Sequence, residues 1–293
     1  MNYYNEIKKQ IINNEITKKI KDYSKNKSDL ETYYQVGKLL SEAKKQYGEG
    51  IIKEYSVKLT NDLGRKYSVR YLFDMRKLYL FTKVHPLDAQ LTLSHYRILF
   101  SLKNENAIDY YIEQIKERRL GKRELIEIIK NNEYERLPKE TKEKLSENRE
   151  IEIQDLVKNP IIIKNSNKYE NISEKVLQKL ILEDISSFLK ELGSGFSFIA
   201  NEYKIKLGNK YNFIDLLLYN IRFKCYTVVE LKTTNLKKEH IGQIETYMHY
   251  IDKNIKTIEE DRTIGIIIVK DNDKYVMEYC SDERILAKEY KMI

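Results

Sequence analysis

Residues 225–235, CYTVVELKTTN, set a glutamate and a lysine into an apolar, β-branched run that is otherwise typical of a buried strand. Side chains two residues apart on a strand point to one face, so Glu230 and Lys232 lie together while Leu231 faces the other way. Burying a charge is expensive unless a partner compensates it. The run therefore predicts a core strand with a functional charged edge. The tripeptide alone carries little weight, because Glu-x-Lys also begins at Glu6, Glu42, Glu140, Glu202 and Glu289.

A second isolated carboxylate, Asp215, interrupts the preceding apolar run, FIDLLLYN. Neighbouring strands could bring Asp215 beside Glu230, and two carboxylates at close range repel each other unless a cation lies between them. A hard divalent cation such as Mg²⁺, with Mn²⁺ as its expected substitute, is held by carboxylates, waters and phosphate oxygens. Lys232 would then orient or help to deprotonate an attacking water. The two runs together predict a site for metal-dependent phosphodiester hydrolysis.

Length and charge limit the class of protein. A chain of 293 residues is long for one compact domain and comfortable for two. The formal net charge of +8 is uneven, since residues 1–131 hold 26 Lys and Arg against 17 Asp and Glu, whereas residues 161–293 hold 21 against 20. A basic domain joined to a nearly neutral one predicts that the first binds nucleic acid and the second acts on it. A lysine-biased composition is the alternative, although it should have made both parts basic.

Residues 1–131 carry apolar side chains at helical spacing, as in YYQVGKLLSEAKKQYG. Within residues 51–81 one amphipathic segment ends at Gly64, and Ser68 suits the N-cap of a second, which gives the outline of a helix-turn-helix. An ordinary helical hairpin with a solvated basic face explains the same pattern. The side chains expected to contact phosphate are Arg65, Lys66, Arg70, Arg76 and Lys77.

The pattern changes after a charged segment, residues 132–160, which is poor in large apolar residues and is expected to form a linker, with partial helix as an open alternative. A helix between the third and fourth of the strands predicted beyond it implies some parallel pairing. The predicted fold class is α/β (α+β), with an all-helical domain over 1–131 and a mixed β-sheet domain flanked by helices over 161–293. We predict helices over 173–193 and 238–252, and strands over 196–207, 211–220, 223–234, 263–270 and 274–280.

Several other polar residues are assigned more modest roles. On the helix over 238–252, Gln243 and Tyr247 belong to a polar stripe that could either reach a site at the strand ends or be an ordinary half-buried stripe. Glu202 and Lys204 are expected to be an exposed edge pair. The four histidines, His85, His95, His240 and His249, lack metal-ligand spacing on a common helical face, so solvated or core roles are expected.

The location of the protein is constrained by what its sequence lacks. No apolar stretch approaches the length needed to cross a bilayer, and the segment MNYYNEIKKQ has no apolar core of a secretion signal. We therefore expect a soluble, cytoplasmic protein without membrane contact. Cys225 and Cys280 are expected to be reduced structural thiols.

These motifs in combination resemble a known family. Asp215 followed by Glu230-x-Lys232 resembles the PD-(D/E)XK nuclease superfamily, with Ile214 in place of the proline. The runs FLKELGSGFSFIANEYKI, FIDLLLYN, VVELKTT, GQIETYMHYID and AKEYKMI resemble the YhcG-like nuclease family of bacteria. Upstream, YGEGIIKEYSVKLTNDLGRKYSVRYLFDMRKLYLF and LSHYRILFSL resemble the N-terminal helical domain of that family, to which DNA binding is attributed. The likeness covers nearly the whole chain.

The resemblance implies a restriction-endonuclease-like sheet domain and specific site residues. Asp215 and Glu230 would be the metal ligands and Lys232 the catalytic lysine. Gln243 and Tyr247 would match a Gln-x-x-x-Tyr pair on the helix after the core. The chain departs from the pattern at one point, because many members carry a glutamate on the first helix where this chain has Gln178. An outer acidic residue could instead be supplied by Glu183 or Glu174.

Two functions from different classes remain open. One is a Mg²⁺-dependent nuclease, for which the resemblance alone favours DNA over RNA. The other is a nucleic-acid-binding protein whose nuclease-like fold has no activity. The intact Asp215, Glu230 and Lys232 favour the enzyme, whereas Gln178 faintly favours the binding protein. Cleavage of two strands would favour a homodimer.

Overall fold

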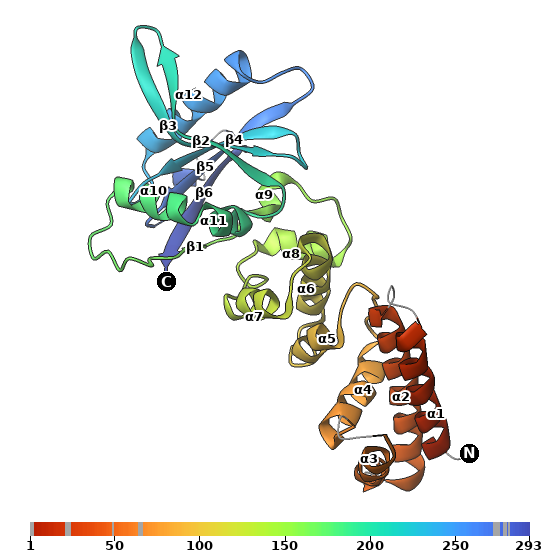
Figure 1. Cartoon of the computed structure of the whole chain (residues 1–293). Coiled ribbons are helices and arrows are strands. Elements are labelled where there is room, and N and C mark those ends of the chain that lie inside the picture. The colour runs from red at the N-terminus through yellow and green to blue at the C-terminus, as the bar shows by residue number, and fades with distance from the viewer. Residues whose placement is uncertain are drawn as a thin grey trace. The chain divides into compact units, whose positions relative to one another are not determined.

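The computed structural model describes residues 3–20, 25–48, 50–63, 67–271, 276–277, 280 and 282–293. By its contacts the chain divides into two compact units, Met1–Asn131 and Asn132–Ile293 (Figure 1). Among the described helices, none combines the length and the apolar character that crossing a membrane requires.

The described part of the first unit is helical, as predicted. Its core gathers apolar side chains of the first four helices around Leu40, Leu59 and Leu72, all buried. Gly37 allows α2 to approach α4 closely, since a Cβ there would collide with the carbonyl oxygen of Met75. The helices are α1 (Tyr3–Ile20), α2 (Lys25–Tyr47), α3 (Gly50–Leu63), α4 (Val69–Phe81), α5 (Leu93–Leu99), α6 (Glu105–Arg118) and α7 (Lys122–Lys130).

Helices α3 and α4 occupy the two segments for which the sequence allowed either a helix-turn-helix or an ordinary helical hairpin. Ser68 is the N-cap of α4, because its side chain accepts a hydrogen bond from the backbone N–H of Tyr71 at 3.4 Å. Ser56 of α3 donates to the carbonyl oxygen of Tyr67 at 3.0 Å and so ties the start of α4 to α3. The expected turn residues Gly64, Arg65 and Lys66 lie outside the described residues.

The second unit is a mixed six-stranded sheet with helices on both faces, which confirms the predicted fold class (Figure 1). The strand order is β1-β6-β5-β4-β3-β2, in which β2, β3 and β4 pair antiparallel and β4, β5, β6 and β1 pair parallel. The strands are β1 (Ile161–Ile163), β2 (Phe196–Leu207), β3 (Lys210–Asn220), β4 (Cys225–Leu231), β5 (Asp261–Val269) and β6 (Ile285–Met292). The helices are α8 (Lys139–Ser146), α9 (Ile153–Leu156), α10 (Glu174–Glu183), α11 (Ile185–Leu192) and α12 (Lys238–Asn254).

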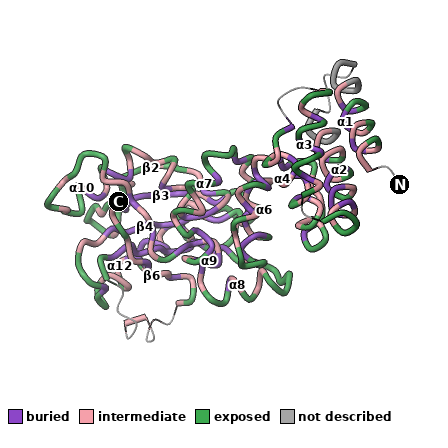
Figure 2. The backbone as a smooth tube through the Cα atoms, turned by 90° about the horizontal axis from the view of Figure 1, so that it is seen from below, coloured by how far each residue is buried: buried purple, intermediate pink, exposed green. Residues whose placement is uncertain are grey.

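Two apolar cores cover the two faces of this sheet. Helices α10 and α11 bury Leu177 and Phe188 on one face, and α12 buries Ile244 and Met248 on the other. Figure 2 shows the buried residues gathered along the strands. Gly265 of β5 lets α12 pack closely, because a Cβ there would lie 2.6 Å from the sulfur of Met248. Both faces are covered because the parallel strands are apolar on both sides.

The structure differs from the sequence prediction in four elements. The helix predicted over 173–193 breaks at Asp184, whose carboxylate accepts from the Ser187 N–H at 3.2 Å and caps α11. The strand predicted over 274–280 falls mostly outside the described residues, and residues 276–277 within it are helical. Strands β1 and β6 were not predicted, since β1 has three residues and β6 mixes charge into its apolar run.

Residues 132–160, expected to be a linker, carry α8 and α9 and belong to the second unit by their contacts. Arg136 binds both carboxylate oxygens of Glu191, at 2.6 and 3.1 Å, and reaches the carbonyl oxygen of Pro160. The buried Lys158 donates to the carbonyl oxygens of Lys190 and Glu191 at 3.0 and 2.8 Å. Some charged side chains of this segment are therefore not solvated linker residues, because they form hydrogen bonds within the sheet domain.

Lys288 of β6 gives a test of this packing. The residue is 9 % exposed, and burial lowers its pKa to about 8, with Asp155 acting in the opposite direction. Because the folded-state pKa is lowered, the buried lysine costs no stability above the unfolded pKa of 10.5, where it is neutral in both states. The protein loses stability as the pH falls from there through about 8, where the buried side chain becomes charged. Lys288→Met should therefore raise the free energy of unfolding at pH 7 by about 3 kcal/mol, at about 1.4 kcal/mol per pKa unit.

The measurement is denaturant unfolding of Lys288→Met and of the wild type between pH 7 and 10. The gain in stability should shrink as the pH rises from 8 toward 10, because the folded-state lysine is then neutral and removing its proton costs less as the pH nears the unfolded pKa of 10.5. Lys291→Met, an exposed lysine of the same strand, is the control and should show no such trend. A gain that does not change with pH would contradict the assignment of a buried ammonium.

Candidate active site

The site lies where β3 and β4 separate. Their antiparallel ladder runs from Asn220 opposite Cys225 to Leu216 opposite Val229, and the same register continued by one residue sets Asp215 opposite Glu230.

Side chains bridge the two backbones at that point. The N–H of Leu231 donates to Asp215 Oδ2 at 2.8 Å, and the N–H of Asp215 donates to Glu230 Oε1 at 3.4 Å. The structure thus brings together the two carboxylates singled out in the sequence, on neighbouring strands.

Both carboxylates are destabilised as anions. Glu230 is 2 % exposed, and burial followed by repulsion from Asp215 raises its pKa to about 7, against the opposing attraction of Lys232. Burial also raises the pKa of Asp215, an effect opposed by the Leu231 N–H and by Lys232. Two neighbouring acids with raised pKa values form a site that a further positive charge would stabilise.

Lys232 follows directly on β4 and is half-buried. Its ammonium donates to Glu230 Oε2 at 3.2 Å, and its backbone N–H donates to the carbonyl oxygen of Ile268 at 2.8 Å. Burial acts to lower the pKa of Lys232, but attraction from Glu230, Glu174 and Asp215 outweighs it, so the pKa is raised. Lys232 is therefore a cation that is bound to Glu230 and attracted by Glu174 and Asp215.

Helix α10 contributes one hydrogen bond and one negative charge to the site. Gln178 Nε2 donates to the backbone carbonyl oxygen of Asp215 at 3.1 Å. One turn earlier, the exposed Glu174 acts electrostatically on Asp215 and Lys232, raising both of their pKa values. Glu183 is engaged elsewhere, since it accepts a hydrogen bond from Asn167 at 2.7 Å and lies 3.9 Å from the ammonium of Lys179. Of the two acidic residues considered for this helix, Glu174 is the one that the structure links to the site.

Helix α12 carries the Gln-x-x-x-Tyr pair. Gln243 Nε2 donates to the hydroxyl of Tyr247 at 3.1 Å, and the Tyr247 ring is 5 % exposed within the apolar core under α12. In the first turn, burial lowers the pKa of His240, as do the charges of Lys232 and Lys237. The start of α12 is therefore electrostatically linked to Lys232.

Two residues near the site were assigned other roles from the sequence. His240 was expected to be solvated or in the core, and Glu202 to belong to an exposed edge pair. Glu202 is exposed, yet its charge also raises the pKa of Asp215. The register of the β2–β3 hairpin is the signal that could have revealed this. Asn201 pairs with Leu216 and Tyr203 with Ile214, so Glu202 lies across from Asp215. His240 gave no such signal, because its approach to Lys232 depends on how α12 packs on the sheet.

The basic side chains of the first unit were expected to contact nucleic acid. Arg70 and Lys77 are exposed on α4 and lie seven residues apart, hence on one face of the helix, while Arg76 between them is half-buried. Arg65 and Lys66 lie outside the described residues. Their role in binding stays a prediction.

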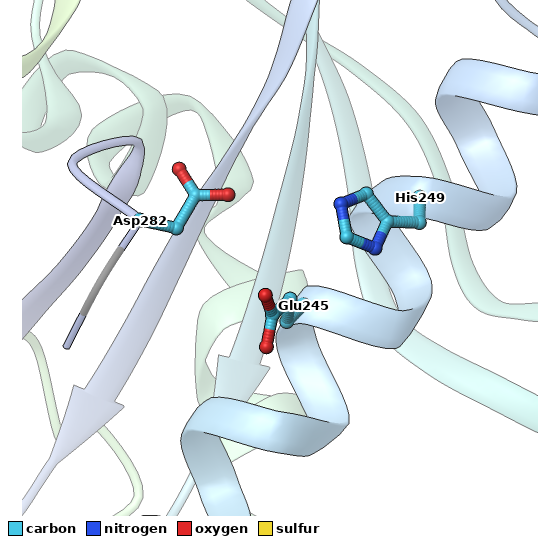
Figure 3. A group of neighbouring side chains, drawn as sticks. All are labelled: Glu245, His249 and Asp282. Carbon is cyan, nitrogen blue, oxygen red and sulfur yellow. The ribbon is translucent and has the colours of Figure 1, made fainter.

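A second group of polar side chains lies on α12, away from Asp215 in the sequence. Glu245 and His249, one turn apart, meet Asp282, and one ligand atom of each lies within 4.8 Å of the others (Figure 3). The Asp282 carboxylate already has a cation, because Arg284 donates to its two oxygens at 2.9 and 2.6 Å and lowers its pKa. Asp215 and Glu230 differ in having raised pKa values despite the nearby Lys232.

The fold and the site define a protein with a nuclease-type α/β domain. Residues 154–293 match the family model of the YhcG PDDEXK nuclease domain, and residues 6–136 match that of the DUF1016 N-terminal domain. The chain belongs to the YhcG-like family. It is 23 % identical over 309 residues to the protein YhcG of Escherichia coli (strain K12), covering 89 % of this chain and 82 % of that protein.

Two solved structures match part of this chain at low identity and with a low TM-score. A repair endonuclease from Pyrococcus abyssi is 16 % identical with a TM-score of 0.29, over 43 % of this chain and 49 % of that one. The EndoMS–dsDNA2 complex is 17 % identical with a TM-score of 0.29, over 43 % of this chain and 48 % of that one. The match thus spans about half the length of each solved chain.

Glu230→Gln tests the electrostatics of the site. The raised folded-state pKa of Glu230 means that its burial costs the folded protein no stability below the unfolded pKa of 4.5, where the acid is neutral in both states. The protein loses stability as the pH rises through about 7, where the buried acid becomes charged. In a buffer with chelator, Glu230→Gln should therefore be more stable than the wild type at pH 8, by at most about 3 kcal/mol.

The free energy of unfolding of both proteins should be compared from pH 8 down to pH 4, where the difference should close because the glutamate is protonated in both states. Glu183→Gln, at an exposed carboxylate of α10, is the matched control and should follow the wild type. A Glu230→Gln variant less stable than the wild type at pH 8 would mean that the Lys232 ion pair outweighs burial.

Proposed function

We propose that the protein is a Mg²⁺-dependent nuclease that hydrolyses phosphodiester bonds of DNA. The observation that supports this most is the pair of destabilised carboxylates, Asp215 and Glu230, with the Lys232 ammonium bound to one of them. The PDDEXK domain match supports a nuclease, and the choice of DNA and of Mg²⁺ is our inference.

The donor set fits a hard divalent cation. Asp215 and Glu230 offer carboxylate oxygens close together, and their raised pKa values mean that a cation would relieve the repulsion. Asp215 and Glu230 would hold Mg²⁺, with Mn²⁺ as a substitute. The bound ion would supply charge neutralisation for the phosphate and would favour deprotonation of a water.

The other side chains orient and stabilise. Lys232 acts as a cation that positions the attacking water and stabilises the charge developing on the phosphate, because its raised pKa leaves no free amine to take a proton. Gln178 fixes the backbone of Asp215, because its side-chain amide donates a hydrogen bond to the backbone carbonyl oxygen of Asp215. We assign Glu174 as the outer acidic residue and, from the family resemblance, Gln243 and Tyr247 of α12 as residues that border the site.

The helical unit, residues 1–131, docks the enzyme on nucleic acid. Its net positive charge and the exposed Arg70 and Lys77 of α4 support phosphate contact in a helix-turn-helix manner. Action in the cytoplasm and a homodimer for cleavage of two strands remain predictions from the sequence.

A non-catalytic binding protein is the second candidate function. Gln178 favours it, because an amide takes the position where many relatives have a glutamate. The amide is hydrogen-bonded to the backbone of Asp215, so it supports the site structurally without supplying a carboxylate. Activity assays separate the two candidates directly.

Lys232→Ala and Asp215→Asn are the decisive variants. The wild type should cleave DNA with Mg²⁺ or Mn²⁺ and stop with chelator, and each variant should lose activity by a factor on the order of 10² or more. Lys232→Ala removes the orienting cation and Asp215→Asn removes a metal-binding charge, while the helical unit stays unchanged. The measurement is cleavage of plasmid and of labelled single-stranded and duplex DNA, with RNA in parallel.

Matched thermal melts must show that both variants are folded, and both should still bind DNA. Glu183→Gln, on α10 but engaged away from the site, is the activity control and should cleave like the wild type. If the wild type cleaves neither DNA nor RNA with any divalent metal, the binding protein takes the place of the nuclease.

Arg70→Ala combined with Lys77→Ala tests the docking unit in the full chain. The double variant should bind duplex DNA more weakly, and the slope of log affinity against log salt should fall by about 1 to 2, since each phosphate contact releases counterions. Fluorescence anisotropy over a salt series measures both quantities. Lys103→Ala, an exposed lysine outside α4, should leave the slope unchanged. An unchanged slope in the double variant would remove α4 from the interface.

A further inference from the structure

The hairpin of β2 and β3 continues beyond the strand that supports it. β4 pairs with β3 only as far as Leu216, whereas β3 begins at Lys210 and pairs with β2 along that whole length. Residues 203–207 and 210–214 therefore form a two-stranded arm that extends from the sheet beside the candidate active site (Figure 1).

The arm has two different faces. Ile205 and Ile214 are buried in the core that α12 covers, so one face holds the arm to the domain. On the alternate positions Tyr211 is 57 % exposed and Phe213 is 52 % exposed. Lys204 and Lys206 are exposed across from them on β2. The second face is thus aromatic and basic at once.

The cations and rings are interleaved on this face. Lys204 pairs in register with Phe213, and Lys206 with Tyr211. The ammonium of Lys204 lies 3.8 Å from the centroid of the Tyr211 ring. Rings on which bases stack, set among cations that bind phosphate, are the elements of a surface for single-stranded nucleic acid.

We propose that the exposed arm face, Lys204, Lys206, Tyr211 and Phe213, binds an unpaired stretch of the nucleic acid that the site cleaves. This inference rests on the proposed nuclease function and adds the form of the substrate. Its position supports it, because Tyr211 and Phe213 precede Asp215 on the same strand, β3, by four and two residues. A strand stacked on the rings would therefore lie close to the carboxylates.

Single-stranded rather than duplex nucleic acid fits this face. Bases in a duplex are stacked on each other and offer only their edges, whereas unpaired bases expose a ring face to an aromatic side chain. Lysines on the same face bind the backbone without reading sequence. We therefore assign the arm to an unpaired segment, such as a single-stranded end or a flap, and the duplex to the helical unit.

Cross-strand packing within the hairpin is the competing explanation for these pairs, since aromatic and lysine side chains on facing strands also stabilise a hairpin. The two explanations differ in their readouts. Packing alone predicts that removal of the rings lowers thermal stability and leaves affinity for single strands unchanged. A binding face predicts the loss of affinity in a protein that is still folded.

The experiment measures binding by the full chain in a Lys232→Ala background with chelator, so that no probe is cleaved. Tyr211→Ala with Phe213→Ala should weaken binding of a fluorescein-labelled oligothymidylate by about tenfold or more, and binding of a hairpin duplex much less. Lys204→Ala with Lys206→Ala should reduce the salt slope for the oligothymidylate. Phe198→Ala, an exposed aromatic at the base of the same hairpin, is the matched control and should bind like its parent.

The outcomes separate this inference from the proposed function. Equal affinity of the ring variant and its parent for oligothymidylate overturns the inference, and cleavage by the wild type would still stand. Loss of affinity in a protein whose wild type cleaves nothing supports the binding face and rejects the nuclease. A change of oligomeric state in the ring variant, measured by size-exclusion chromatography with light scattering, together with unchanged affinity, would assign the face to a second copy and overturn the proposal.

Discussion

The candidate site depends on the place where the β3–β4 ladder stops. Beyond Leu216 and Val229 the two backbones no longer pair, and the Asp215 carboxylate takes the hydrogen bond of the Leu231 N–H instead. A buried backbone donor requires a partner, so this arrangement holds a carboxylate at a fixed position. The same separation leaves room for Glu230, whose oxygen meets the Asp215 N–H. Two acids are thereby held close together, with repulsion that the ammonium of Lys232 only partly offsets.

The mixed sheet surrounds this point with different kinds of support. The antiparallel β2–β3 hairpin projects past it, while the parallel pairing of β4 with β5 anchors Lys232 through the carbonyl oxygen of Ile268. Helix α10 supplies Gln178 and Glu174 on one side, and α12 supplies His240 on the other. Each group reaches the site from an element whose own apolar face is buried, so the packing of the two cores sets the position of every polar partner.

Local sequence patterns predicted where most helices and strands lie, but they did not predict where one helix breaks into two. β2, β3 and α12 follow the expected spans closely, because apolar alternation and helical periodicity are local properties of the chain. The break at Asp184 was missed, since a run of helix-favouring residues hides a side chain that caps the next helix. β6 was missed because Lys288 is buried in a sheet core, a situation that its charge argues against.

The sequence by itself determined the helical and mixed-sheet halves and singled out Asp215, Glu230 and Lys232, because an isolated charge in an apolar strand is visible without a structure. Only the tertiary structure decided which distant residues join them. Glu174 rather than Glu183 acts on the site, and Glu202 and His240 come near it, through the turn of α10, the register of the hairpin and the docking of α12. These are electrostatic interactions between residues far apart in the chain, and they follow from how buried faces pack, which periodicity in one segment does not specify.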